Sequence, residues 1–160
     1  MTIDEDAAPV SVRRVELDSL LAQGLIRELN AELKQRYPEP GATHFRLEAD
    51  EVAEGRGAFL VAFKGDEPAG CGAVRRIGED TAEIKRMYVR SAARGRGVGR
   101  AILEALVAEA RRIGMQRLLL ETGERQPEAL GLYHSAGFVP APRYGEYVGS
   151  PVSICLGKDL

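Results

Sequence analysis

The stretch ARGRGVGR, Ala93 to Arg100, alternates glycine with other residues immediately before a run with helical periodicity. Glycine costs a helix about 1 kcal/mol per position relative to alanine, so glycines at a helix start need a physical reason. Without side chains, successive backbone N–H groups can converge on one point, next to the unpaired N–H groups of the first helical turn. The stretch therefore predicts an anion site suited to phosphate, to which Arg94, Arg96 and Arg100 add positive charge.

The residues around this loop predict a strand before it and a helix after it. Thr81–Val89 is typical of a strand, and a helix is expected from Gly97 to Ile113, ended by Gly114. Its apolar face consists of Val98, Ile102, Leu106, Ala110 and Ile113. Further along, Gln116–Thr122 predicts a buried strand and Gln126–Ala136 a short helix. The last extended pieces are expected at Tyr144–Val148 and Val152–Gly157.

The N-terminal half predicts a strand, a helix and then a meander of strands. Val10–Val15 alternates weakly, and a helix to about Arg36 is indicated by Leu20, Leu21, Leu25, Leu29 and Leu33. His44–Leu47 is a short extended candidate, and Ala58–Lys64 and Pro68–Ile77 form a hairpin around Gly65–Glu67. We expect one domain over residues 1–160, with 1–8 as a flexible tail and a mixed sheet flanked by helices.

Composition narrows the classes of partner. The chain is 44% hydrophobic and 29% charged with a net charge of −2, which argues against disorder and against bulk attraction to nucleic acid or membranes. Between Glu83 and Arg100, however, six residues are basic and one is acidic, which suggests a small anionic ligand or a solvated basic face. The two cysteines lack metal-ligand spacing, so no metal is expected. The N-terminus has no signal-peptide pattern, and we expect a cytoplasmic protein.

Among phosphate-binding loops, two common ones do not fit. A Walker loop needs Lys-Ser or Lys-Thr after its glycines, and the Rossmann pattern needs a glycine where Arg100 stands. The stretch EIKRMYVRSAARGRGVGRAILEALVAEARRIGMQRLLLET, Glu83 to Thr122, resembles the acetyl-CoA-binding core of the GCN5-related N-acetyltransferases, the GNAT superfamily. A second segment, ALGLYHSAGF from Ala129 to Phe138, is similar to the family's LYxxxGF motif.

This resemblance implies a fold and a set of contacts with the acyl donor. The expected fold is α+β, with a central, mostly antiparallel twisted sheet of about seven strands and about four helices. Acetyl-CoA is expected as the acyl-donor substrate, with the family's central strand splayed from its neighbour so that the N–H of Met87 or Val89 faces the donor. The loop residues expected to bind it are Arg94, Gly95, Arg96, Gly97, Val98, Gly99 and Arg100. Gln126 stands where the family often has an asparagine that contacts the cofactor.

The implied reaction is direct transfer of an acetyl group to a primary amine of a small molecule or amino acid. Only about 1 in 2,500 alkylamine molecules is neutral at pH 7, so a base is useful. Glu83 is the candidate base, and the alternative is a solvent-facing carboxylate paired with a residue such as Lys85. Tyr133 is the candidate general acid for the thiolate, and the alternative is an aromatic that only packs in the core.

Other interpretations stay open at this point. The acceptor could be a protein lysine or N-terminus, or the chain could be a non-catalytic acyl-CoA sensor, and a homodimer is compatible with either. Cys71 raises an acetyl-cysteine route, but no neighbouring base would activate it. His134 is expected at the surface and His44 is a weaker candidate for the acceptor side. Tyr37, Arg75, Arg76 and Tyr144–Tyr147 are further acceptor-side candidates.

Overall fold

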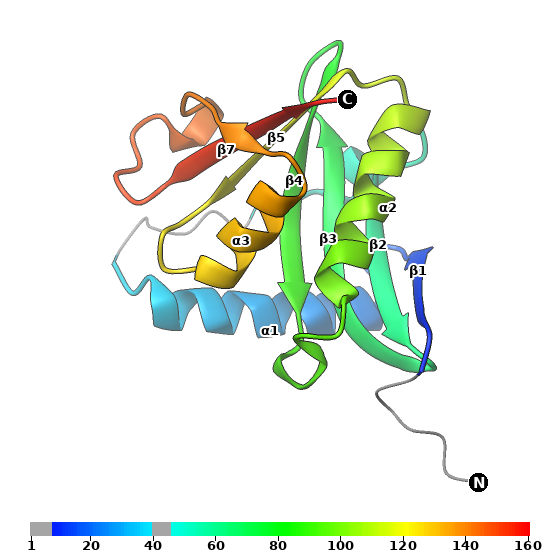
Figure 1. Ribbon diagram of the computed structural model, residues 1–160. Coiled ribbons are helices and arrows are strands. Elements are labelled where there is room, and N and C mark those ends of the chain that lie inside the picture. Colours follow the sequence, from blue (N-terminus) through cyan, green and yellow to red (C-terminus); the bar gives the residue numbers. More distant parts are fainter. Residues whose placement is uncertain (1–7, 40–45) are drawn as a thin grey trace, which may run out of the picture.

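The computed structural model describes residues 8–39 and 46–160, and within them one seven-stranded sheet runs through the molecule (Figure 1). The strand order is β1-β2-β3-β4-β5-β7-β6, and every neighbouring pair is antiparallel except β4 and β5. The strands are β1 Val10–Arg14, β2 Gly57–Lys64, β3 Glu67–Arg76, β4 Thr81–Val89, β5 Arg117–Thr122, β6 Val139–Pro140 and β7 Ile154–Asp159. The expected mixed, mostly antiparallel sheet is confirmed.

Three α-helices cover the two faces of this sheet in the described residues (Figure 1). They are α1 Leu20–Arg36, α2 Val98–Arg112 and α3 Pro127–Ser135. Strand β2 shows how both faces are filled: Ala58 and Leu60 join the core with α2, whereas Phe59 and Val61 join the core with α1. Because both faces are covered, the strand is apolar throughout rather than alternating.

Strands β4 and β5 separate halfway along their length. They pair in parallel only from Thr81 to Ile84 on β4 and from Arg117 to Leu120 on β5. Beyond these residues β4 continues beside β3, and β5 continues beside β7, so the two strands diverge (Figure 1). The backbone of β4 from Lys85 to Val89 is thereby released from β5. This is the splay that the family resemblance implied.

A β-bulge lies in β4 where the splay begins. Cys71 pairs with Tyr88 and Ala73 with Lys85, so Gly72 stands opposite two residues, Arg86 and Met87. Arg86 has φ 58°, in the left-handed region that non-glycine residues rarely adopt. A Cβ at Gly72 would lie 2.8 Å from the Met87 sulfur and from Ile102, so a larger residue opposite the bulge would displace these side chains.

Three expectations differ from the structure. The described residues contain three α-helices and three short 3₁₀ turns, fewer helices than the four expected. Tyr144–Val148 is not extended: Gly145–Tyr147 is a 3₁₀ turn that begins at Gly145 with φ 52°, and the extra strand is β6. Leu20 is 94% exposed, because at 100° per residue it lies about 140° around the helix from buried Leu25.

Candidate functional site

The glycine loop joins β4 to α2 in a conformation that requires glycine. Gly95 and Gly97 have φ of 79° and 80°, and Gly97 is the residue that caps α2. A Cβ at either position would meet no atom of the protein within 4 Å, so the space beside them is open to a ligand. At Gly99 a Cβ would lie 3.1 Å from Leu132, so this glycine allows α2 to approach α3. The loop therefore combines an open backbone with a tightly packed helix start.

A cleft of about 470 Å³ lies between this loop, α1 and α3, and we call it the glycine-loop cleft. Its lining includes all but one of the residues predicted to bind the acyl donor, namely Met87, Val89, Arg94, Gly95, Gly97, Val98, Gly99, Arg100 and Gln126. Arg96 is exposed and does not line it. The cleft thus runs from the start of α2 to the place where β4 and β5 separate.

Two arginines at the cleft are held by polar contacts. Arg94 forms an ion pair with Glu32 of α1 at 2.6 Å, and its Nε donates to the Val89 carbonyl oxygen at 3.0 Å. Arg100 donates to the Ser135 hydroxyl at 2.7 Å. Both cations therefore stand beside the N-terminus of α2, where a phosphate group would find N–H donors and positive charge together.

A narrower cavity of about 80 Å³, which we call the inner cavity, opens where the strands separate. Four residues line both the inner cavity and the glycine-loop cleft: Leu29, Met87, Gln126 and Tyr133. Tyr133 is 5% exposed and packs edge-on against Phe138, with ring centroids 5.9 Å apart. Burial raises the pKa of Tyr133, and the nearby Glu121 carboxylate raises it further, so its hydroxyl keeps its proton.

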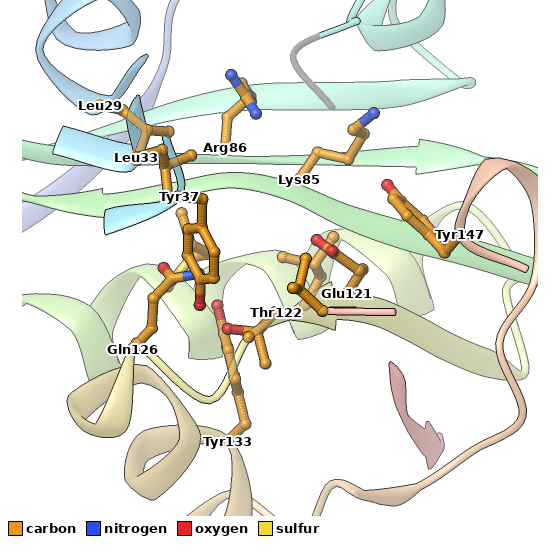
Figure 2. A pocket seen from close by; sticks show the side chains of 14 residues that line it. Leu29, Leu33, Tyr37, Lys85, Arg86, Glu121, Thr122, Gln126, Tyr133 and Tyr147 are labelled. Atoms are coloured by element: carbon orange, nitrogen blue, oxygen red, sulfur yellow. The ribbon is translucent and has the colours of Figure 1, made fainter. Parts of the chain in front are cut away.

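Glu121, which the sequence reasoning missed, lies in the wall of the inner cavity (Figure 2). It is the first β5 residue beyond the pairing with β4, and its Oε2 accepts a hydrogen bond from the Ser153 hydroxyl at 2.6 Å. Burial raises the pKa of Glu121 to about 7, although the hydrogen bond from Ser153 acts in the opposite direction. A charged residue that ends the apolar run LLLE was the available signal for it.

Glu83 lies in an enclosed, hydrogen-bonded environment, and its role as the general base stays a prediction. Its side chain is 1% exposed, so it is not a solvent-facing carboxylate. It accepts hydrogen bonds from the Tyr144 hydroxyl at 2.5 Å and from Arg75 Nε at 2.9 Å, and Arg75 also contacts Glu51. It is not among the lining residues of the glycine-loop cleft or the inner cavity. Its geometry is that of a residue that positions Tyr144 and Arg75.

The remaining candidates separate into those near the inner cavity and those away from it. Tyr37 and Tyr147 line it, and the Tyr37 hydroxyl accepts from the Arg125 backbone N–H at 3.1 Å. Burial raises the pKa of the Cys71 thiol to about 12, which makes an acetyl-cysteine intermediate unfavourable. His134 is exposed, as expected, and His44 lies outside the described residues. No helix in residues 8–39 and 46–160 has the length and apolar character needed to span a bilayer.

A glycine loop at a helix start, next to a splayed strand pair, is the arrangement expected of an acyl-CoA-dependent acyltransferase. Comparison with known proteins agrees. Residues 22–138 match the Acetyltransferase (GNAT) family, and the chain belongs to this family. It is therefore an acyl-CoA-dependent acetyltransferase.

Individual relatives are similar over most of their length. The chain is 37% identical over 137 residues to an IAA acetyltransferase of Azospirillum brasilense, covering 85% of this chain and 88% of the relative. The crystal structure described as an acyl-CoA N-acyltransferase from Klebsiella pneumoniae subsp. pneumoniae MGH 78578 is similar, with a TM-score of 0.80 at 26% identity. The match covers 94% of this chain and 97% of that one. A GNAT family acetyltransferase from Elizabethkingia anophelis, solved with acetyl-CoA bound, has a TM-score of 0.66 at 18% identity over 94% and 98%.

Proposed function

We propose that the protein transfers the acetyl group of acetyl-CoA directly to a primary amine of a small molecule. The observation that carries this proposal is the continuity of the two hollows: Tyr133, Met87 and Gln126 line both of them. A donor in the glycine-loop cleft would present its thioester at the point where an acceptor in the inner cavity ends.

The donor would be held by its phosphates and its pantetheine arm. The pyrophosphate would take the backbone N–H groups at the start of α2, with Arg94 and Arg100 beside them. The arm would lie along β4, where the N–H of Met87 or Val89 can donate to it because β5 no longer pairs there. Gln126, which precedes Pro127 at the start of α3, would hydrogen-bond the same arm.

The chemical step needs one proton acceptor and one proton donor. The neutral amine nitrogen attacks the thioester carbon, the C–S bond breaks, and the coenzyme leaves as a thiolate. We assign the proton lost by the amine to Glu121, because this carboxylate lines the inner cavity and a pKa near neutrality suits a base at pH 7. The proton gained by the thiolate comes from Tyr133, the buried phenol between the two hollows. Glu83 would hold Tyr144 in position by accepting the hydrogen bond from its hydroxyl.

The dimensions and charge of the inner cavity favour a small acceptor over a protein segment. The cavity is narrow, about 80 Å³, and its charged lining residues are Lys85, Arg86 and Glu121. A broad acidic groove would bind a lysine-bearing peptide better than this narrow cavity does.

An amine panel with acetyl-CoA, followed by free-thiol release and product mass, tests this function. We expect acetylated amine in step with thiol, and a turnover loss in the variant Tyr133→Phe. Tight binding of CoA without turnover on any amine would instead indicate an acyl-CoA sensor.

A further inference from the structure

The bulge in β4 changes which face of the sheet Arg86 occupies. In a regular strand, side chains alternate, so neighbours such as Lys85 and Arg86 would point to opposite faces. Here Met87 packs against Gly72, Ile102 and Leu106 on the α2 side, while Tyr88 packs with the core under α1. Lys85 and Met87 point to opposite faces, as two adjacent residues of a regular strand would. Arg86 is the extra residue inserted between them.

The contacts of Lys85 and Arg86 show that both cations project to the α1 side. Arg86 Nη1 donates to the Asn30 side-chain oxygen on α1 at 2.7 Å. Lys85 Nζ donates to the Arg46 carbonyl oxygen at 2.8 Å and lies 3.5 Å from Glu146. Figure 2 shows the two side chains leaving β4 in the same direction, away from Tyr133. Both residues line the inner cavity and both are buried.

The inner cavity therefore has two chemically different ends. Tyr133 and Gln126 also line the glycine-loop cleft and so mark the donor end, and Glu121 lies between them and Lys85 (Figure 2). Arg86, on Asn30 of α1, and Lys85, beside Arg46 and Glu146, lie on the side of the cavity that faces away from Tyr133. Buried cations at that end reward a negative group on the acceptor, and the planar guanidinium suits paired oxygens better than the ammonium does. Of the two cations, Arg86 has the larger number of N–H donors, so we assign it the larger contribution.

We propose that the acceptor is an amine that also carries an anionic oxygen group, a carboxylate or a phosphate, which Arg86 binds with help from Lys85. This inference rests on the proposed amine acetylation and adds the chemical class of the acceptor. A compact amino acid or aminoalkyl phosphate would place its amine at Glu121 and its anionic group at Arg86.

The test compares acceptors that share a skeleton and differ in charge. Alanine, alaninamide and ethylamine form one set, and β-alanine and 2-aminoethyl phosphate distinguish carboxylate from phosphate. Values of kcat/KM are corrected for the neutral fraction of each amine. We expect the anionic members to exceed the neutral ones at least tenfold in the unmodified protein. The better member of the carboxylate–phosphate pair identifies the group.

Variants then assign the preference to a residue. Arg86→Gln should lower kcat/KM for the anionic acceptors about ten- to a hundredfold, mainly through KM, and cost the neutral amide far less. Arg86→Lys should restore part of the loss, and Lys85→Gln should show a smaller loss. Arg111→Gln, at the exposed end of α2, is the matched control and should change nothing.

Two results would overturn the proposal. The first is equal turnover of anionic and neutral acceptors by the unmodified protein. Arg86 would likewise be a structural residue if Arg86→Gln and Arg86→Lys each lost activity equally with anionic and neutral acceptors. In either case amine acetylation would stand. If no amine of either kind is acetylated although CoA binds, the proposed function fails, and the acceptor class fails with it.

Discussion

Replacing Glu121 with glutamine should lower activity and raise stability at the same pH. The folded-state pKa of Glu121 is about 7 because of burial, and the ordinary value is 4.5. A base works only when ionised, so about half of the molecules are competent at pH 7 and about 1 in 100 at pH 5. In a plot of log(kcat/KM) against pH, the slope should therefore fall by one as the pH rises through about 7. In Glu121→Gln this bend should vanish, and turnover at pH 7.5 should fall about 10²–10⁴-fold.

The stability change follows from the same pKa. Below the unfolded-state value of 4.5 the carboxyl group is protonated in both states and costs nothing. As the pH rises from 4.5 to about 7, the unfolded chain ionises first, so the stability due to protonated Glu121 is progressively lost. Above pH 7 the folded protein has lost roughly 3 kcal/mol of stability through this carboxyl group. The variant escapes this loss, and its amide oxygen can still accept from Ser153.

Thermal unfolding of the two proteins at pH 4.5 and pH 8 measures this effect. At about 2–4 °C per kcal/mol for a chain of this length, Glu121→Gln should melt roughly 6–12 °C higher than the unmodified protein at pH 8, and almost equally at pH 4.5. Glu83→Gln is the matched comparison and should keep the kinetic bend. Glu104→Gln, exposed on α2, should alter neither property. If the bend disappears in Glu83→Gln and persists in Glu121→Gln, Glu83 is the base that the sequence indicated and the present assignment is wrong.

Three further outcomes are expected. Tyr133→Phe should reduce turnover about 10²–10⁴-fold with CoA affinity nearly unchanged, as measured by thiol release and calorimetry; near-normal turnover would leave Tyr133 as a packing residue. Gly97→Val should weaken CoA binding at least tenfold, about 1.4 kcal/mol, because a side chain would occupy the open side of a residue with φ 80°; unchanged affinity in a folded variant would contradict the phosphate-loop assignment. Glu32→Gln should strengthen CoA binding by up to about fivefold, because Arg94 no longer exchanges an exposed ion pair for phosphate; weaker binding would show that Glu32 orients Arg94 instead.

The parts that could be predicted from the sequence are those fixed by local patterns. Periodicity indicated α2, whose Val98, Ile102 and Leu106 are all buried, and the glycine spacing indicated the loop that lines the cleft. The run LLLE marks Glu121 as a charge at the end of a buried strand, but its place in the inner cavity could not be predicted, because it depends on where a parallel strand pair ends. The sequence around Arg86 likewise looks like a regular strand, since the bulge depends on the packing of α2 against Gly72.

The bulge has a consequence for how related chains can diverge. Because Arg86 is a supernumerary residue, Lys85 and Met87 on either side of it already point where an uninterrupted strand would send them. Deleting that single position would leave the core contacts of Met87 and Tyr88 in phase and remove one charge from the lining of the inner cavity. Exchanging its side chain would likewise leave the α2 packing untouched. The residue at position 86 can therefore change, or be deleted, without a change in strand pairing or in the core, and such a change would alter which acceptor the same fold can bind.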